Sequence, residues 1–212
     1  MQMKIERTVA EALLNINAVK LQPHNPFMWA SGWKSPIYCD NRKTLSFPLI
    51  RSLIKRELVA IIRAKYPQAE VIAGVATGAI AQGVLIAEAL DLPFVYVRSA
   101  PKNHGMENLI EGNLNAGEKV VVVEDLISTG GSSIKAVEAL RAGGGDVLGM
   151  VAIFTYNFPA ATKLFANNEV KLTTLSNYQA VIKTAVEISY ISKDDVATLQ
   201  KWRKNPAEWG AQ

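Results

Sequence analysis

The stretch from Val120 to Ser133 constrains the fold more than any other, because its pattern predicts a buried strand, a loop and a helix start in succession. The four consecutive valines of Val120–Val123 are typical of a central parallel strand that is covered on both faces. Apolar residues with helical spacing follow over Ile134–Ala142. The loop between them is therefore expected at the carboxyl end of a strand, where open α/β sheets bind ligands.

The composition of this loop favours a phosphate group as its ligand. Gly130 and Gly131 allow the backbone to approach a ligand closely, and Ser128, Thr129 and Ser132 supply hydroxyl groups. The helix that follows presents free N–H groups and the positive end of its dipole to the loop. These features together predict a site for a phosphate monoester.

Two acids, Glu124 and Asp125, precede the loop. Carboxylates repel a phosphate, but they accept hydrogen bonds from sugar hydroxyls and can help to hold a hydrated Mg²⁺. A phosphate, a diol and a cationic centre indicate a phosphorylated ribose as the ligand. On this stretch alone, an ordinary strand-to-helix turn with an acidic, serine- and threonine-rich N-cap remains the alternative.

The same residues carry a family resemblance. Glu124–Ser132, with the sequence E-D-L-I-S-T-G-G-S, resembles the phosphoribosyl pyrophosphate (PRPP) motif of type I phosphoribosyltransferases. The resemblance implies that the acid pair binds the ribose hydroxyls and that Ser128–Ser132 hold the 5′-phosphate. It also implies Mg²⁺ as the cofactor, bound mainly through PRPP and waters, so no metal ligand is assigned in the chain. The implied PRPP-binding residues here are Glu124, Asp125, Leu126, Ile127, Ser128, Thr129, Gly130, Gly131 and Ser132.

A second motif lies near the N-terminus. The chain predicts a helix over Ile5–Val19 that ends near Lys20, and then a hairpin over Phe27–Arg42 that turns at Ser31-Gly32. The hairpin resembles the S-G-x-K-S-P-x-Y segment of orotate phosphoribosyltransferases, which implies a hood that closes over the base. The residues expected to bind orotate are Tyr38, Arg42, Ser128 and Tyr156. Tyr156 departs from relatives that place a base-binding arginine there and is a candidate substitute for it. A surface hairpin whose tryptophans pack a small core is the alternative.

Further elements lie between the two motifs. A helix is predicted over Phe47–Tyr66, and its expected inward residues are Leu49, Ile50, Leu53, Leu58, Ile61 and Ile62. A strand from Val71 leads into a small-residue loop and a helix over Ile80–Leu90. The resemblance implies that Ala76 and Thr77 in this loop contact pyrophosphate, although helix entries often carry such residues for structural reasons alone.

The irregular segment from Arg98 to Gly112 is too long for a simple connection in a compact domain, and such loops are usually functional or disordered. It resembles the mobile catalytic loop of orotate phosphoribosyltransferases. That likeness implies that Arg98, Lys102 and His104 cover the departing pyrophosphate, and that the loop serves the active site of a partner subunit. Solvated surface side chains are the alternative for each cation. Ser99 departs from relatives that have a lysine there, as Ala30 does in the hairpin.

Length and composition limit the other possibilities. The chain has 212 residues, 49% of them hydrophobic, and its net charge is only +4 without a run of basic residues, which argues against nucleic acid as a partner. Cys39 is the only cysteine, which excludes an internal disulfide and suits a reducing compartment. No apolar run reaches the ~20 residues of a membrane span, so we expect cytoplasmic residence.

The expected fold is α/β, with a central, mostly parallel sheet flanked by helices in the manner of type I phosphoribosyltransferases. A strand over Val147–Phe154 completes the core, and a strand over Val170–Thr174 is expected to return to the hood. One domain is expected over 1–212, in which a hood of about 1–45 with 168–212 joins a core of about 46–167.

The resemblance implies an Mg²⁺-dependent orotate phosphoribosyltransferase of pyrimidine biosynthesis, which uses PRPP and orotate and forms a homodimer with shared sites. Its implied catalytic residues are Lys102, His104, Glu124 and Asp125. A transferase for another base and a PRPP-binding regulator without turnover are the alternatives. The cation-bearing loop argues against the regulator, because a sensor does not have to stabilise a leaving group.

Overall fold

The computed structural model describes residues 2–29, 32–100 and 109–209. The chain forms two compact units: a larger one over Leu45–Leu175, and a smaller one that combines Met1–Thr44 with Ser176–Gln212. The first boundary lies where the sequence places the start of the core, and the second lies after residue 175 rather than 167. Whether the two units act as one domain stays a prediction.

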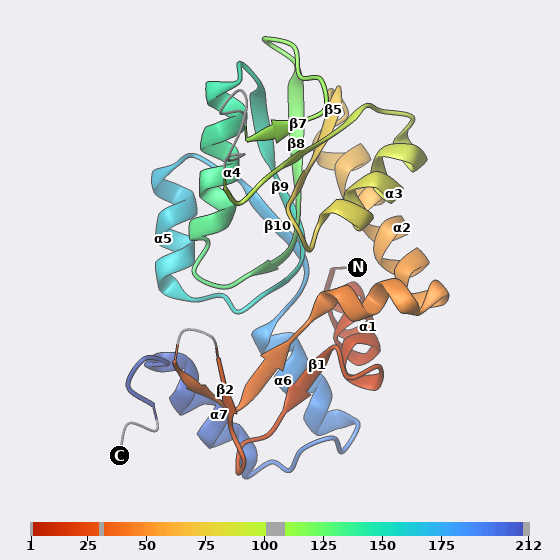
Figure 1. The fold of residues 1–212 in the computed structure, drawn as a ribbon. Coiled ribbons are helices and arrows are strands. Elements are labelled where there is room, and N and C mark those ends of the chain that lie inside the picture. The colour runs from red at the N-terminus through yellow and green to blue at the C-terminus, as the bar shows by residue number, and fades with distance from the viewer. Residues whose placement is uncertain (1, 30–31, 101–108, 210–212) are drawn as a thin grey trace. The chain divides into compact units, whose positions relative to one another are not determined.

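A six-stranded sheet forms the centre of the larger unit (Figure 1). In spatial order its strands are β10 (Leu172–Asn177), β9 (Asp146–Thr155), β8 (Lys119–Ile127), β5 (Val71–Val75), β6 (Phe94–Val97) and β7 (Ile110–Glu111). The four strands from β9 to β6 run parallel, while β7 is antiparallel to β6. The predicted mostly parallel sheet is thereby confirmed. The strand predicted over Val170–Thr174 is present as β10, which pairs with β9 at the edge of this sheet and leads the chain into the smaller unit.

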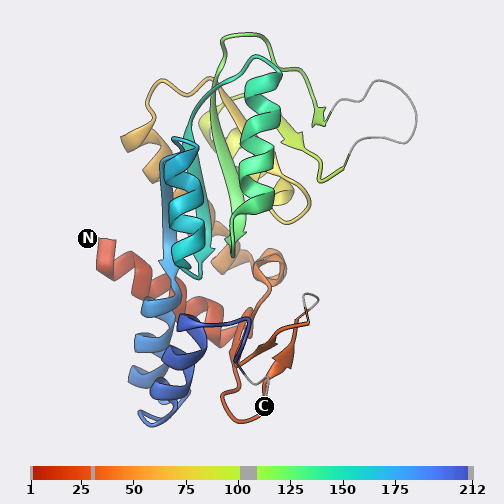
Figure 2. The ribbon, with the colours of Figure 1, turned by 90° about the vertical axis from the view of Figure 1, so that its left-hand side faces the viewer.

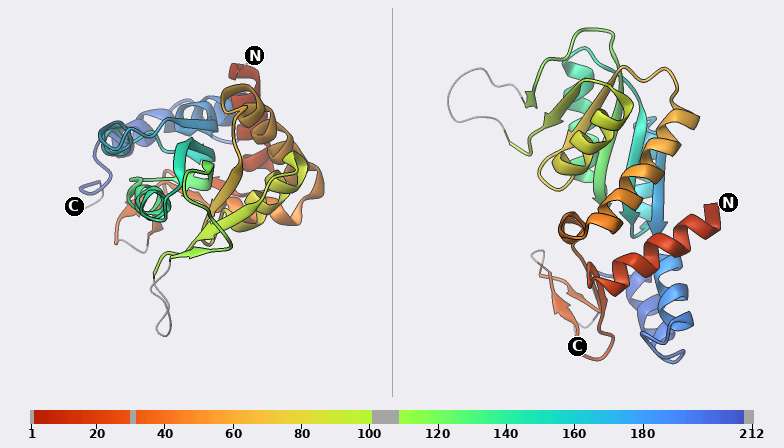
Figure 3. Two further views of the ribbon diagram at one scale, coloured as in Figure 1. Left: turned by 90° about the horizontal axis from the view of Figure 1, so that it is seen from above. Right: turned by 90° about the vertical axis from the view of Figure 1, so that its right-hand side faces the viewer.

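Helices cover both faces of the sheet. The pair α2 (Pro48–Lys65) and α3 (Ile80–Leu90) lies on one side, and the pair α4 (Gly131–Ala142) and α5 (Pro159–Asn167) lies on the other (Figures 2 and 3). This double cover explains why the valines Val120–Val123 of β8 are completely buried.

The buried face of α2 differs from the predicted one. Leu49 is 88% exposed, whereas Ile54, Leu58 and Ile62 are buried. These three residues recur every four positions and form one stripe along the helix, and Leu49 lies off that stripe. The inward position predicted for Leu49 is therefore wrong.

The smaller unit begins with α1 (Gln2–Asn15), which ends earlier than the predicted Lys20. Asn17 adopts a left-handed conformation with φ 55°, and Val19 already belongs to β1 (Val19–Leu21). The predicted hairpin is confirmed, with β2 (Phe27–Met28) antiparallel to β3 (Lys34–Ser35). The next strand, β4 (Ile37–Cys39), pairs with β1.

The 3₁₀-helix η1 (Asn41–Ser46) leads the chain into the larger unit, and the chain returns to the smaller unit in α6 (Tyr178–Glu187) and α7 (Asp195–Lys204). Trp202 of α7 is completely buried, and its indole N–H donates a hydrogen bond of 3.2 Å to the carbonyl oxygen of Lys34. The α7 helix is thus fixed to the hairpin strand β3. Within the described ranges, no helix has the length and apolar character that crossing a bilayer requires.

Candidate active site

The strands β5 and β8 are neighbours in the sheet, yet the chain leaves them in opposite directions. After β5 the chain enters α3 on one face, and after β8 it enters α4 on the other face (Figure 3). The register pairs Gly74 with Val123, so the two carboxyl ends lie side by side. Such a switch point opens a crevice between diverging loops, and it is where open α/β sheets bind ligands. Both predicted phosphate-binding loops start at this point.

The loop after β8 delivers the chain directly into α4. Gly130, the N-cap residue, has φ +84°, and a Cβ atom there would lie only 2.8 Å from the ring of Phe165. Glycine is therefore required by the backbone conformation and by the close approach of the ring. A Cβ atom on Gly131 would meet nothing within 4 Å. The first turn of α4 thus presents backbone N–H groups beside open space, as an anion site requires.

Glu124, at the end of β8, is 5% exposed, and the protein contacts both of its carboxyl oxygens. The Asp125 backbone N–H donates to Oε1 over 2.9 Å, and the Ser133 hydroxyl donates to Oε2 over 2.9 Å. Burial, followed by the nearby charge of Asp125, raises the pKa of Glu124 to about 8. Glu124 therefore remains largely protonated at neutral pH.

Ser133 is absent from the set predicted from the sequence. It lies in the first turn of α4, where a hydroxyl can face back toward the strand end. Ser133 could have been identified from the sequence as a hydroxyl residue in the first turn of a helix that follows a strand with an acidic residue at its end. Carboxyl oxygens can accept more than one hydrogen bond, so the contact of Glu124 with ribose hydroxyls stays a prediction.

Asp125 lies beside the loop that follows β5. A Cβ atom built on Gly78 would be 2.7 Å from Oδ1 of Asp125, so the carboxylate in its present position lies directly against this glycine. Ala76 and Thr77, which are joined by a cis peptide bond, precede Gly78 directly. The acid pair and the predicted pyrophosphate loop are therefore adjacent in space.

A cavity of about 370 Å³ lies at the same edge of the sheet. Its walls include four residues predicted to bind PRPP, which come from three separate segments: Ala76, Arg98, Gly131 and Ser132. Ser99 and Lys135 also line it. Lys135 follows Ser132 by three positions on α4, so the two share a helix face. The predicted set of PRPP-binding residues omits Lys135, although its spacing from Ser132 could have identified it from the sequence.

Arg98 lies at the entrance of the predicted catalytic loop, directly after β6. Its backbone N–H donates to the carbonyl oxygen of Leu109 over 2.8 Å, and its guanidinium lies 3.3 Å from the carboxylate of Glu111 in β7. These contacts hold the two ends of the loop together. Lys102 and His104 lie outside the described residues, as do Ala30 and Ser31 of the hairpin.

The predicted orotate-binding residues have different environments. Tyr38 is 39% exposed, and its ring centroid lies 5.6 Å from that of Phe27. The Arg42 guanidinium donates to Asp40 over 2.7 Å and holds the pKa of that carboxyl below its usual value. Both belong to the smaller unit, and their contact with a base stays a prediction.

Tyr156, which follows β9, is only 2% exposed. Its ring stacks on Phe158 with a centroid distance of 5.4 Å, and Phe154 meets it edge-on at 5.3 Å. This packing places the ring in the core and gives no support to the base contact predicted for it.

The described part of the chain contains no group of three or more His, Cys, Asp and Glu side chains that could hold a metal ion. The pair Glu124 and Asp125 is the acidic feature of the candidate site. Mg²⁺ usually keeps several waters and binds through one or two carboxylates together with substrate phosphates. The residues present therefore fit an Mg²⁺ ion that arrives with a phosphorylated ligand, and they do not form a cage of their own.

Comparison with known proteins agrees with this arrangement. A family model described as a phosphoribosyl transferase domain matches residues 47–188. The orotate phosphoribosyltransferase of Bacteroides thetaiotaomicron is 62% identical, over 98% of this chain and 98% of the relative. That of Listeria innocua is 53% identical, over 98% of this chain and 100% of the relative. The solved structure of orotate phosphoribosyltransferase from Aeropyrum pernix matches with a TM-score of 0.75 at 27% identity, covering 87% of this chain and 99% of that one. The chain therefore belongs to the orotate phosphoribosyltransferase family.

Proposed function

We propose that this protein transfers the 5-phosphoribosyl group of PRPP to orotate, which yields orotidine 5′-monophosphate and pyrophosphate in pyrimidine biosynthesis. The placement of Glu124–Ser132 carries the proposal. This stretch occupies the carboxyl end of β8 at the switch point of the sheet, where the first turn of α4 faces open space. Family membership supports orotate as the base, since the relatives reported above bear that activity in their names.

In the proposed mechanism, the backbone N–H groups and hydroxyls of Ser128–Ser132 bind the 5′-phosphate. Asp125 accepts hydrogen bonds from the ribose hydroxyls, and its charge offsets the positive charge that develops on the ribose ring as the bond from C1 to pyrophosphate breaks. Glu124 fixes the local geometry through its contacts with Ser133 and the Asp125 backbone. Mg²⁺, when bound, neutralises phosphate charge.

Pyrophosphate leaves with more negative charge than it carries in the bound substrate. Ala76 and Thr77 contact it from the loop after β5, and Arg98, Lys102 and His104 cover it from the catalytic loop. Orotate supplies the nitrogen that takes the place of pyrophosphate on C1, so the protein needs no covalent nucleophile. Positioning and electrostatics provide the catalysis.

The enzyme acts as a homodimer in which the catalytic loop of one subunit completes the site of the other. The loop carries three cationic positions in its sequence, and the contact between Arg98 and Glu111 closes its base, which supports this arrangement. We place the enzyme in the cytoplasm, where its single cysteine, the buried Cys39, would stay reduced.

An assay with a panel of bases tests the proposed function. Purified protein is incubated with PRPP and Mg²⁺ together with orotate, uracil, adenine or hypoxanthine, and pyrophosphate release is measured. The proposal predicts turnover with orotate and little with the other bases. Turnover with a purine alone would identify a different transferase. PRPP binding without any turnover would identify a regulator.

A further inference from the structure

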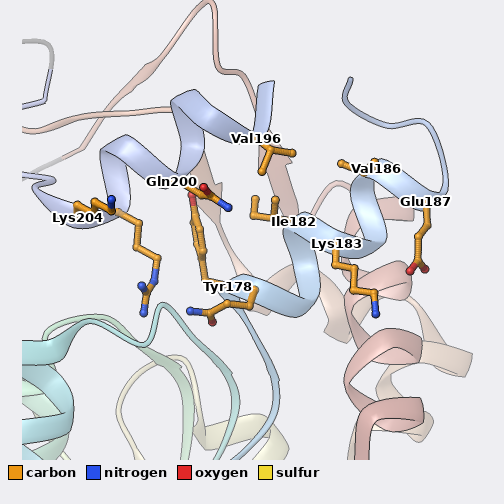
Figure 4. A pocket seen from close by; sticks show the side chains of 10 residues that line it. Tyr178, Ile182, Lys183, Val186, Glu187, Val196, Gln200 and Lys204 are labelled. Carbon is orange, nitrogen blue, oxygen red and sulfur yellow. The ribbon is translucent and has the colours of Figure 1, made fainter. Parts of the chain in front are cut away.

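A second cavity lies entirely within the smaller unit, between α6 and α7 (Figure 4). It has a volume of about 550 Å³, within the range of ~300–1,000 Å³ that is usual for small-molecule sites. None of its residues was predicted to act in phosphoribosyl transfer. We call it the α6–α7 groove, and its lining residues are Tyr178, Gln179, Ile182, Lys183, Val186, Glu187, Val196, Gln200, Arg203 and Lys204.

The floor of the groove is apolar. Ile182 and Val186 from α6 face Val196 from α7, as the side chains in Figure 4 show. The hydroxyl of Tyr178 donates to the carbonyl oxygen of Leu199 over 2.8 Å, so it is already engaged and its ring serves as an apolar wall. This contact also ties the two helices together. A ligand in the groove would therefore meet a preformed apolar surface.

The rim of the groove is positively charged. Lys183, Arg203 and Lys204 line it, and the guanidinium of Arg203 lies 5.8 Å from the centroid of the Tyr178 ring. Glu187 is the one acid among the lining residues, and it pairs with Arg7 over 2.9 Å. Arg7 also pairs with Glu11 over 3.2 Å, so it offsets Glu187 only in part, but three cations still outnumber one acid among the lining residues.

The helix dipole favours two of these three cations. Cations in the last turn of a helix interact favourably with its dipole, which explains Arg203 and Lys204 at the end of α7. Lys183 lies inside α6, before its last turn, where the helix dipole gives no such gain, and its acidic neighbour at helical spacing is Glu187. The apolar floor and the cationic rim together suit a ligand that is both apolar and negatively charged.

We propose that the α6–α7 groove is a second small-molecule site, which binds an amphipathic anion with a slender apolar body and one carboxylate or phosphate group. The body lies along Ile182, Val186 and Val196. From Tyr178 to Val186 the α6 helix rises ~12 Å, which sets the length of the body. The anionic group lies at the end formed by Arg203 and Lys204.

Calorimetric titration of the full chain tests this proposal with two probes that share a ten-carbon chain. Decanoate carries a negative head group, and decyltrimethylammonium carries a positive one. Saturable binding of one decanoate per chain and no saturable binding of the cation are expected. Equal binding of both probes, or no saturable binding of decanoate, would overturn the proposal.

Matched variants locate the binding. Arg203→Gln should weaken decanoate binding about tenfold, which corresponds to ~1.4 kcal/mol for one charge-assisted contact. Lys201→Gln removes the same charge from the same turn of α7, but Lys201 does not line the groove. The Lys201→Gln variant should therefore bind decanoate as tightly as the wild type does. Thermal unfolding checks that each variant folds, and Lys204→Gln replaces Arg203→Gln if loss of the contact with Tyr178 unfolds the protein.

Equal weakening by the Lys201 and Arg203 substitutions would show that decanoate responds only to total charge, and the proposed site would be wrong. Sedimentation velocity tests whether a second copy of the chain occupies the groove instead. If Arg203→Gln dissociates an oligomer and leaves decanoate binding unchanged, the groove is an interface between copies of the chain, which also contradicts the proposal.

Discussion

Replacing Glu124 by glutamine removes a carboxyl that the fold keeps protonated, and this change should make the protein more stable at alkaline pH. The pKa of Glu124 rises from 4.5 to about 8 because the side chain is buried, with a further rise from the neighbouring charge of Asp125. Such a rise corresponds to at most ~5 kcal/mol of lost stability once the group is ionised in both states. Glutamine keeps the shape, its oxygen can accept from the Asp125 backbone N–H, and its NH2 group can donate to the Ser133 hydroxyl, but it cannot ionise.

The sign follows from the two pKa values. Below about pH 4.5 the carboxyl is protonated in the folded and the unfolded chain, so it costs nothing. Between 4.5 and about 8 the unfolded chain loses the proton while the folded chain keeps it, and stability falls as pH rises. Above that range the penalty is constant. The free energy of unfolding of Glu124→Gln should therefore exceed that of the wild type by a margin that widens with pH.

Urea denaturation of both proteins, measured at about pH 5 and about pH 9, gives this margin directly. After allowance for local relaxation, we expect it to widen by ~2–4 kcal/mol between the two conditions. The control is Glu138→Gln, a substitution at an exposed position of α4. Its difference from the wild type in the free energy of unfolding should be the same at both pH values. Two parallel stability curves for the wild type and Glu124→Gln would refute the reasoning about the buried carboxyl.

Four further predictions concern the candidate site. Gly131→Ala should keep wild-type stability, because the methyl group meets no protein atom, yet raise the KM for PRPP at least ~10-fold by occupying the space of the phosphate. Gly130→Ala should instead lower the free energy of unfolding by ~1–3 kcal/mol, and the reverse pattern in melting and kinetics would contradict both assignments. Lys135→Gln should raise the KM for PRPP up to ~5-fold with kcat unchanged, as expected for a partly solvated cation, and an unchanged KM would remove Lys135 from the site. Asp125→Asn and Lys102→Ala should each be inactive alone, and mixing them should restore up to about a quarter of wild-type activity if the subunits share sites, whereas no recovery would argue for sites within one subunit.

The central strand and helix could be predicted from the sequence because their signals are local. The valine run of β8 and the apolar spacing of α4 stand in continuous stretches. The helix starts at Gly131, three residues before the apolar spacing begins at Ile134, because its first turn consists of small residues that carry no apolar period. The phosphate loop was predictable for the same reason, since all its residues are consecutive.

Errors arose where pairing between distant segments decides the outcome. Val19 continues the apolar period of α1, yet it pairs with Cys39 in a strand once Asn17 has turned the chain. The strand from Leu172 was predicted, but its pairing with β9 was not, because nothing in its own sequence indicates that neighbour. Tyr156 follows a strand end as a ligand-binding residue would, and aromatic neighbours at 154 and 158 hold its ring in the core, so its contact with the base stays a prediction.

The contacts that organise the acid pair also escaped prediction. Ser133 reaches Glu124 from the next element, and Gly78 leaves space for Asp125 from a loop almost fifty positions earlier. Each depends on two elements that meet only in the folded chain. A sequence can therefore indicate which residues carry the chemistry sooner than it can indicate which residues hold them in place.

The crystal structure of this protein with PRPP and Mg²⁺ tests the central claim most directly. The account predicts that the 5′-phosphate oxygens accept hydrogen bonds from the backbone N–H groups of Thr129–Ser132 and that the Asp125 carboxylate contacts the ribose hydroxyls. A 5′-phosphate bound between Arg98 and Lys135, with no contact to that loop, would contradict it.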